Sequence, residues 1–290
     1  MPGGSVLRKF LIVLEMIKIE HTVFALPFAY LGAFLGVRGL PGWNRSFWIL
    51  VAMVGARSAA MGFNRLVDMR IDAQNPRTSG RALPRGLVST GFVATFVIAS
   101  AGLLFLAGWM LNPLSLELVP IALVIVLGYS YTKRFTSLSH LFLGLALGIA
   151  PIGGWVAVRG ELSWEPWLLS AAVLLWVAGF DIIYSCQDVG FDQDVGLYSF
   201  PSRLGVRRAL WLSSLFHVGM LGVLIWVFFL FRLSWLSWMG LLLVAITLIY
   251  EHRLVRPGDL SRVNAAFFTL NGLVSILLLV FVGLDLCLVV

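Results

Sequence analysis

Charged residues are scarce in this chain. Asp, Glu, Lys and Arg together make up 12% of its 290 residues, whereas they make up about a quarter of a typical soluble domain. The chain is therefore not expected to be an ordinary soluble protein. Cysteine is also rare, because Cys186 and Cys287 are the only two, and they show neither a disulfide framework nor metal-ligand spacing. We interpret both as small core residues in or near apolar segments.

Apolar runs fill most of the remaining sequence. Hydrophobic residues make up 60% of the chain, and its mean hydropathy is +0.95. Runs of roughly 20 apolar residues recur, which is the length that crosses a hydrocarbon core of about 30 Å. We therefore expect an all-α polytopic membrane protein that forms one domain over residues 1–290. About nine spans are predicted, near residues 10–36, 46–67, 91–111, 117–132, 138–158, 164–188, 208–231, 234–251 and 264–288.

Basic residues give the chain a net charge of +7, and they are unevenly distributed. With nine spans, most of them fall in the N-terminal tail and the even-numbered loops, while the opposite side holds Arg38, Arg45, Arg159 and Arg232. Cytoplasmic loops of membrane proteins carry such an excess of Lys and Arg. The pattern predicts a protein of the cytoplasmic (inner) membrane with its N-terminus inside. Membrane lipid is the expected environment; we expect no nucleic acid, and no obligatory protein partner is evident.

A first polar stretch, residues 57–86, begins in an apolar run and ends in an arginine-rich loop. Its oxygen-bearing side chains and the arginines after them are Asn64, Asp68, Asp72, Arg77 and Arg81. The first three are four residues apart, so on a helix they share one face. Carboxylate and amide oxygens suit Mg²⁺, which proteins usually hold with few ligands plus substrate phosphates. Arginine matches phosphate geometry and stays charged. The stretch therefore predicts a site for Mg²⁺ and phosphate groups.

A second polar stretch, residues 181–205, repeats this pattern about 120 residues later. Its acidic and hydroxyl side chains again have helical spacing: Asp181, Tyr184, Asp188, Asp192 and, in the following loop, Ser199. One acidic ladder would be explained by a capped, solvated helix end. Two ladders in an apolar chain, each followed by a loop with Gly, Pro and Arg, favour a shared functional site.

The first stretch resembles the N-x-x-x-D-x-x-x-D…R-T-x-x-R-x-L signature of the UbiA superfamily of intramembrane prenyltransferases, and the second is similar to its D-x-x-Y-x-x-x-D-x-x-x-D…S-x-P signature. The resemblance extends to the hydrophobic layout of nearly the whole chain. It implies about nine transmembrane helices around a central cavity that opens near the cytoplasmic face. Arg65 and Ala82 depart from the pattern, since many members have an acidic residue and proline there. Both departures leave the metal-ligand positions intact and concern the acceptor subtype.

The resemblance also implies a reaction: Mg²⁺-dependent transfer of a polyprenyl group from an allylic diphosphate to an aromatic acceptor. We expect metal ligands at Asn64, Asp68, Asp72, Asp188 and Asp192. The expected catalytic residues are Asp68, Asp72, Asp188, Asp192, Asp181 and Tyr184. The expected substrate-binding residues are Arg57, Asn64, Arg77, Arg81, Lys133, Arg134, Tyr129 and Ser199.

The acceptor is suggested by two further features. Arg57 lies seven residues before Asn64, nearly two helical turns, so it points the same way from deeper in the membrane. A charge at that depth is costly and indicates a functional role, here binding of an acceptor carboxylate. The stretch YSYTKRFTSLSHLFLG, residues 129–144, is similar to the corresponding connection of 4-hydroxybenzoate polyprenyltransferases. We therefore expect 4-hydroxybenzoate, prenylated ortho to its hydroxyl in ubiquinone or menaquinone synthesis; a naphthoate on a menaquinone route is the alternative.

Other interpretations remain for single residues and for the whole chain. Arg57 could instead pair with a neighbouring helix, Lys133 and Arg134 could serve topology alone, and His140 fits a hydrogen-bonded helix start better than a catalytic base. A secondary transporter, which couples ions to substrate movement, is the alternative of another class. Its acids are expected near the bilayer midplane between broken helices. Here the acids lie beside basic loops at the predicted cytoplasmic mouth, which favours the enzyme.

Overall fold

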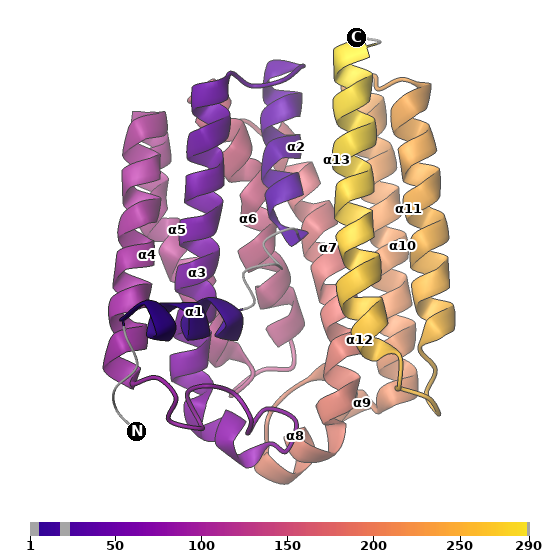
Figure 1. Ribbon diagram of the computed structural model, residues 1–290. Helices are drawn as coiled ribbons and strands as arrows, with labels where there is room; N and C mark the ends of the chain where they lie inside the picture. The colour runs from indigo at the N-terminus through magenta and orange to yellow at the C-terminus, as the bar shows by residue number, and fades with distance from the viewer. Residues whose placement is uncertain (1–5, 18–23, 289–290) are drawn as a thin grey trace.

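The computed structural model describes residues 6–17 and 24–288, and within these ranges the regular structure is helical apart from one isolated bridge between Arg256 and Asp259 (Figure 1). Within these two ranges, eight helical segments are long and apolar enough to cross a membrane. Six of them are single helices: α3 (Trp43–Gln74), α4 (Thr90–Leu111), α5 (Pro113–Thr132), α6 (Ser139–Arg159), α10 (Val206–Phe231) and α11 (Trp235–Leu254). The other two are Glu165–Val195, which begins with α7 (Glu165–Ser185), and Val263–Leu288, which ends with α13 (Asn271–Leu288). The predicted all-α polytopic class is confirmed.

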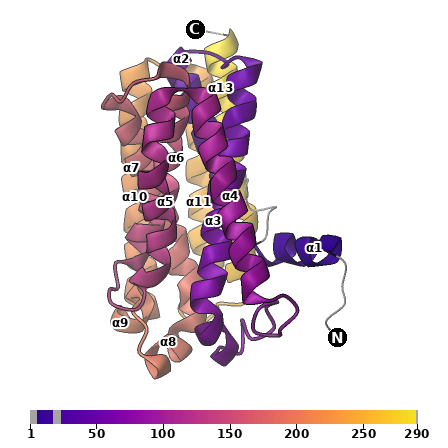
Figure 2. The same ribbon diagram turned by 90° about the vertical axis from the view of Figure 1, so that its left-hand side faces the viewer.

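The first predicted span, 10–36, is not one helix. It overlaps two helices, α1 (Val6–Met16) and α2 (Leu26–Val37), and Figures 1 and 2 show α1 lying perpendicular to the bundle while α2 runs along it. Lys18, Glu20 and His21 interrupt the apolar run of the sequence between them, and these residues lie outside the described ranges. The 12 residues of α2 measure about 18 Å, which is shorter than a hydrocarbon core. In the described ranges the bundle therefore has eight long helices and one short apolar helix.

Two polar helix ends also differ from the prediction. α3 continues to Gln74, well beyond the expected end near residue 67, so its acidic residues stay on one helix. The segment after α7 is broken instead: a 3₁₀ turn (Cys186–Asp188) is followed by the short helices α8 (Val189–Val195) and α9 (Phe200–Leu204). The predicted single helical face through residues 181–192 is therefore bent after Ser185.

Small residues let neighbouring helices approach closely. α2 packs along α6, and a Cβ atom added at Gly154 would lie 1.8 Å from the carbonyl oxygen of Ala29. A Cβ at Gly32 would lie 2.0 Å from the carbonyl oxygen of Pro151. Small residues at helix contacts are typical of membrane bundles, where close van der Waals packing replaces the hydrophobic effect. Ala29 on α2 and Gly154 on α6 both line the cavity described below, so this contact forms part of its wall.

In the described ranges, the largest buried apolar cluster lies between α2 and the helices of the C-terminal half. Phe28, Trp176, Met220, Leu224 and Leu278 belong to it and come from α2, α7, α10 and α13. The C-terminal ends of α3 and α7 lie at the same end of the bundle as α8 and α9 (Figure 1). That end carries the polar residues on which the predicted function depends.

Candidate active site

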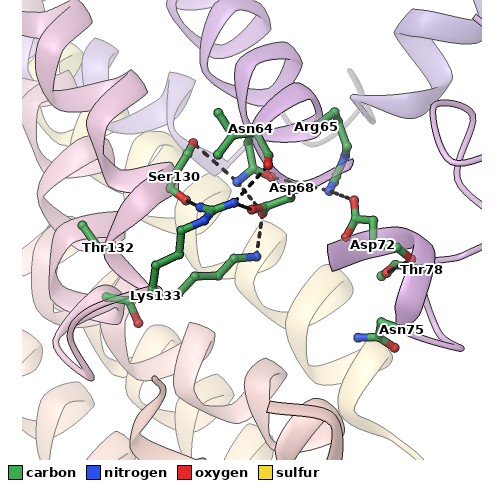
Figure 3. Close-up of polar contacts among 12 residues, drawn as sticks. Asn64, Arg65, Asp68, Asp72, Asn75, Thr78, Ser130, Thr132 and Lys133 are labelled. Atoms are coloured by element: carbon green, nitrogen blue, oxygen red, sulfur yellow. Dashed lines mark hydrogen bonds and ion pairs between the residues drawn. The ribbon is translucent and has the colours of Figure 1, made fainter. Parts of the chain in front are cut away.

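Asp68 is a buried carboxylate surrounded by basic groups. Only 2% of the residue is exposed, yet Lys133 Nζ lies 2.6 Å from its Oδ2 atom and Arg134 donates to its Oδ1 atom at 3.0 Å (Figure 3). Asn64, one turn earlier on α3, donates to Asp68 Oδ2 at 3.2 Å. A buried charge is tolerated only when it is paired and hydrogen-bonded. The basic pair after α5, Lys133 and Arg134, therefore compensates the buried carboxylate of Asp68.

Asp72, the next acid along α3, is bound by arginines from two directions. Arg81 NH1 lies 2.6 and 2.7 Å from its two carboxylate oxygens, and Arg65 NH1 lies 3.8 Å from Oδ2. Thr78 donates to the Asp72 carbonyl oxygen at 3.1 Å, which folds the loop after α3 back onto the helix. The hydrogen bond from Thr78 thus places Arg81, which belongs to the same loop, beside the Asp72 carboxylate.

The loop after α3 also reaches the second acidic stretch. Arg77 contacts both carboxylate oxygens of Asp188, at 2.9 and 2.5 Å, and donates to the Tyr184 hydroxyl at 2.8 Å. Asn75, which ends α3, donates to Asp188 at 2.9 Å and accepts from the Arg77 backbone N–H. Burial alone would lower the pKa of Arg77, but the bonds with Asp188 and Tyr184 raise it overall, so the guanidinium stays charged.

Asp181 is oriented by a histidine. Its Oδ2 atom lies 2.7 Å from His140 Nδ1, and His140 Nε2 accepts from the backbone N–H of Phe200 at 3.2 Å. Because a backbone N–H can only donate, Nε2 is unprotonated and the Nδ1–H group donates to the carboxylate. His140 is 2% exposed and begins α6, so it joins α6, α7 and α9 through one ring.

A cavity of about 800 Å³ connects these groups. Twelve of the predicted site residues line it: Arg57, Asn64, Asp68, Asp72, Arg77, Arg81, Tyr129, Lys133, Asp181, Tyr184, Asp188 and Asp192. Beyond Arg57 its walls are apolar except for Ser115, and they reach Leu111 and Val156 near the C-terminal ends of α4 and α6. The cavity thus has one densely charged end and a long hydrocarbon-like remainder.

Two predicted residues lie behind the cavity wall. Arg134 donates to the backbone carbonyls of Ser130 and Val67 as well as to Asp68. Ser199 caps α9 and donates to Asp192 Oδ2 at 3.0 Å. Neither lines the cavity, so each acts on it through the carboxylate that it holds.

Several cavity residues were missed from the sequence. Arg65, a departure from the family pattern, lines the cavity, and its Nε atom has no hydrogen-bond partner among the described residues. Asn75 lines it too, and its place directly after the acidic ladder was the signal available for it. Phe180, Phe267 and Phe268 also line it, and no polar motif marks these aromatic residues in the sequence.

The donor atoms fit Mg²⁺ brought in with a phosphate group. Within residues 6–17 and 24–288, no three His, Cys, Asp or Glu side chains form a ready-made metal cage. The acids and Asn64 offer only oxygen donors to the cavity, which suits a hard cation, and Mg²⁺ is commonly held by one or two carboxylates plus substrate oxygens. The residues that could hold it are Asn64, Asp68, Asp72, Asp188 and Asp192.

Comparison with known sequences gives consistent matches. Residues 25–273 match the UbiA prenyltransferase family. A 4-hydroxybenzoate octaprenyltransferase of Methylobacillus flagellatus is 30% identical over 239 residues, which cover 80% of this chain and 79% of that protein. The enzyme of the same name from Aliivibrio fischeri strain MJ11 is 29% identical over 242 residues, covering 82% of this chain and 83% of that one.

Solved structures show the same architecture. The apo structure of a UbiA homologue from Aeropyrum pernix K1 has a TM-score of 0.85 and 37% identity, covering 92% of this chain and 98% of the other. A UbiA homologue from Archaeoglobus fulgidus bound to DMAPP and Mg²⁺ has a TM-score of 0.73 and 20% identity, covering 96% and 99%. At 20% identity the similarity concerns the fold.

Proposed function

Because this chain belongs to the UbiA prenyltransferase family, we propose that it transfers a polyprenyl group from an allylic polyprenyl diphosphate to an aromatic acid with the help of Mg²⁺. It is a prenyltransferase and an integral multi-pass membrane protein. The acceptor we propose is 4-hydroxybenzoate, prenylated at the carbon ortho to the hydroxyl, in ubiquinone or menaquinone synthesis. The names of its relatives support this choice. We also propose that residues 1–290 form one domain.

The cavity is the observation that carries this proposal. A prenyl diphosphate has a dense anion at one end and hydrocarbon along the rest, and the cavity has the same division. Arg77, Arg81 and Lys133 face its polar end and match the phosphate oxygens in charge. Asn64, Asp68 and Asp72 would hold one Mg²⁺ and Asp188 and Asp192 a second. Bound there, Mg²⁺ would neutralise the leaving diphosphate.

The chain's own residues supply the rest of the reaction. The allylic C–O bond breaks and its electron pair leaves with the diphosphate, which the three basic side chains retain. The allylic cation then forms a C–C bond with the acceptor ring, and the ring loses one proton. Tyr184 and Tyr129 line the cavity and present aromatic faces that stabilise positive charge. Asp181, held by His140, faces the developing cation, and the apolar walls exclude competing water.

Arg57 is the proposed partner of the acceptor carboxylate. It lines the cavity from α3, about 10 Å along the helix from Asn64. That separation puts the acceptor deeper than the diphosphate, so the ring can meet the allylic carbon from the inner side. Tyr129, which also lines this part of the cavity, adds a hydroxyl and an aromatic face near the same position.

We place the polar end of the cavity at the cytoplasmic face of the inner membrane. The opposite ends of the helices carry the four isolated arginines: Arg38 after α2, Arg45 at the start of α3, Arg159 at the end of α6 and Arg232 after α10. The greater positive charge lies at the other end, as the positive-inside rule expects of the cytoplasmic side. The acids lie at this mouth rather than midway along the helices, which favours an enzyme over a transporter.

An acceptor screen tests the proposal. Purified protein is given geranyl diphosphate, Mg²⁺ and either 4-hydroxybenzoate, a hydroxynaphthoate or phenol, and products are identified by mass spectrometry. We expect ortho-geranylated 4-hydroxybenzoate, lost in Asp68→Ala and Asp188→Ala. Asp194→Ala is the control, because Asp194 is exposed on α8 and does not line the cavity. Preference for the naphthoate would make a naphthoate the proposed acceptor. No product with any acceptor, together with ion-coupled uptake in vesicles, would show that the protein is a transporter and not an enzyme.

A further inference from the structure

A π-helical turn interrupts the last membrane segment beside the cavity. α12 (Val263–Ala265) leads into the π-turn Ala266–Leu270, and α13 follows directly. A π-turn inserts one extra residue into a helix and alters its backbone hydrogen bonds, so it needs a local reason to persist. Two residues of this turn, Phe267 and Phe268, line the cavity. The turn therefore determines which way two cavity side chains point.

Asn271 holds this turn with its side chain. Its Nδ2 atom donates to the backbone carbonyls of Ala266 at 3.2 Å and Phe267 at 3.3 Å, and to Glu251 Oε1 at 3.0 Å. Its Oδ1 atom accepts from Trp176 Nε1 at 2.7 Å. Asn271 and Glu251 are both fully buried. Polar residues are expensive within a membrane segment, and here every donor and acceptor of the amide has a partner.

The π-turn places Phe267 in an aromatic wall that consists of Phe180, Tyr184, Phe267 and Phe268. The ring centroids of Phe267 and Tyr184 are 4.2 Å apart, and Phe267 meets Phe180 edge-on at 5.2 Å. All four rings line the cavity. Trp176, the indole that bonds to Asn271, packs against Phe180 at 5.0 Å. Asn271 is thus connected to the wall in two ways: it bonds to the backbone of the π-turn, and it bonds to Trp176, which packs on Phe180.

The wall is linked in turn to the polar end of the cavity. The Tyr184 hydroxyl accepts from Arg77, and Arg77 holds Asp188. Tyr184 therefore has one face against Phe267 and its hydroxyl on the arginine proposed to bind diphosphate. A shift of Phe267 would change the support of both the aromatic face and this hydroxyl.

We propose that Asn271, fixed by Glu251 and Trp176, is a positioning residue for the reaction: it holds the π-turn that keeps Phe267 packed on Tyr184 at the edge of the cavity. This inference rests on the proposed prenyl transfer. The role of the wall is to keep water from the allylic cation while its faces stabilise the charge. When the wall is loosened, water adds to the cation and loses a proton, so a prenyl alcohol forms in place of the prenylated acceptor.

Two readouts test this role. The first is the ratio of geraniol to geranylated acceptor formed from geranyl diphosphate and Mg²⁺, together with kcat and KM. The second is the ¹⁹F resonance of 4-fluorophenylalanine incorporated at position 267, which reports the packing of that ring without any turnover. Asn271→Leu removes the amide and keeps the number and branching of the side-chain heavy atoms. Glu251→Gln is the conservative variant, because it keeps the oxygen that accepts from Asn271. Thr247→Val is the matched control, since the Thr247 hydroxyl donates to the carbonyl oxygen of Leu243 within its own helix, α11.

We expect Asn271→Leu to shift the ¹⁹F resonance, to raise the alcohol-to-product ratio and to lower kcat about tenfold, as displacement of reacting groups does, with KM for the diphosphate within about twofold. Glu251→Gln and Thr247→Val should leave both readouts close to wild type. Should Asn271→Leu fail to fold, Asn271→Asp, which keeps the oxygen facing Trp176 and loses the donors, is judged by the same readouts.

A folded Asn271 variant with an unchanged resonance and an unchanged product ratio would overturn the inference. So would an effect of equal size from Thr247→Val, because a general loss of stability would then explain both. Failure of the proposed function is distinguishable: wild-type protein would form no prenylated product with any acceptor, while the ¹⁹F measurement would still decide whether Asn271 positions Phe267.

Discussion

Arg77 and Asp188 are 111 residues apart in the chain and form a two-point ion pair, with nitrogen–oxygen distances of 2.9 and 2.5 Å. Arg77 belongs to the loop that follows the first acidic stretch, and Asp188 belongs to the second stretch. Their pairing brings the two stretches to one cavity. Guanidinium and carboxylate match in this fork geometry, so the pair also fixes the orientation of the loop.

The fork geometry predicts that lysine cannot replace arginine at position 77. Lys has a point charge and cannot contact both oxygens of Asp188 and the Tyr184 hydroxyl together. Arg77→Lys should raise KM for geranyl diphosphate about tenfold or more, as expected for a lost charged hydrogen bond. Steady-state kinetics measure the effect, and Arg70→Lys on the exposed side of α3 is the control. Equal kinetics in the two variants would exclude a special role for the fork.

Removal of Mg²⁺ should abolish activity without unfolding the protein. Asp68 is already paired with Lys133 and Arg134, and Asp72 with Arg81. Because both carboxylates have cationic partners without a metal, the fold of the protein does not require one. Excess chelator should lower product formation at least about a hundredfold, since the leaving diphosphate loses its neutralising charge. Thermal unfolding monitored in the same samples should change little. A large fall in the unfolding temperature would mean that the metal is structural.

Arg57 should affect the acceptor more than the donor. If its guanidinium binds the carboxylate of 4-hydroxybenzoate, Arg57→Ala should raise KM for that acceptor about tenfold or more while KM for the diphosphate stays within about twofold. Phenol, which has no carboxylate, should be used equally well by the variant and the wild type. Equal losses for both substrates would count against the assignment.

The contact between α2 and α6 should depend on Gly154. A Cβ atom there would lie 1.8 Å from the Ala29 carbonyl oxygen, which requires the two helices to separate. Gly154→Ala should destabilise the protein by about 1–3 kcal/mol, the usual cost of overpacking. The neighbouring variant Gly153→Ala meets no atom within 4 Å and should be neutral or slightly stabilising. Thermal or denaturant unfolding of the two variants compares them directly.

The sequence predicted those parts of the site that depend on local spacing. Asn64, Asp68 and Asp72 are one turn apart and lie on α3, because helical periodicity requires it. Their basic partners could not be assigned in the same way. The Lys133–Asp68 bond joins residues 65 positions apart, and only the packing of α3 against α5 brings them together.

The sequence pattern also did not predict the local breaks in the helices. The spacing of Asp181, Asp188 and Asp192 suggested one helical face, but a 3₁₀ turn at Cys186–Asp188 redirects the chain. The π-turn before Asn271 was missed for a related reason, since its stabilising partners, Glu251 and Trp176, come from other helices. Apolar periodicity contains no signal for hydrogen bonds of this kind.

The most direct measurement of the central claim is the position of bound metal. A structure of the protein with Mn²⁺ in place of Mg²⁺ and an unreactive thiolo analogue of geranyl diphosphate, with anomalous scattering to locate manganese, would show it. The account predicts two metal peaks at the polar end of the cavity, one beside Asn64, Asp68 and Asp72 and the other beside Asp188 and Asp192, with the diphosphate between them. Manganese bound elsewhere, or the diphosphate held outside this cavity, would contradict the account.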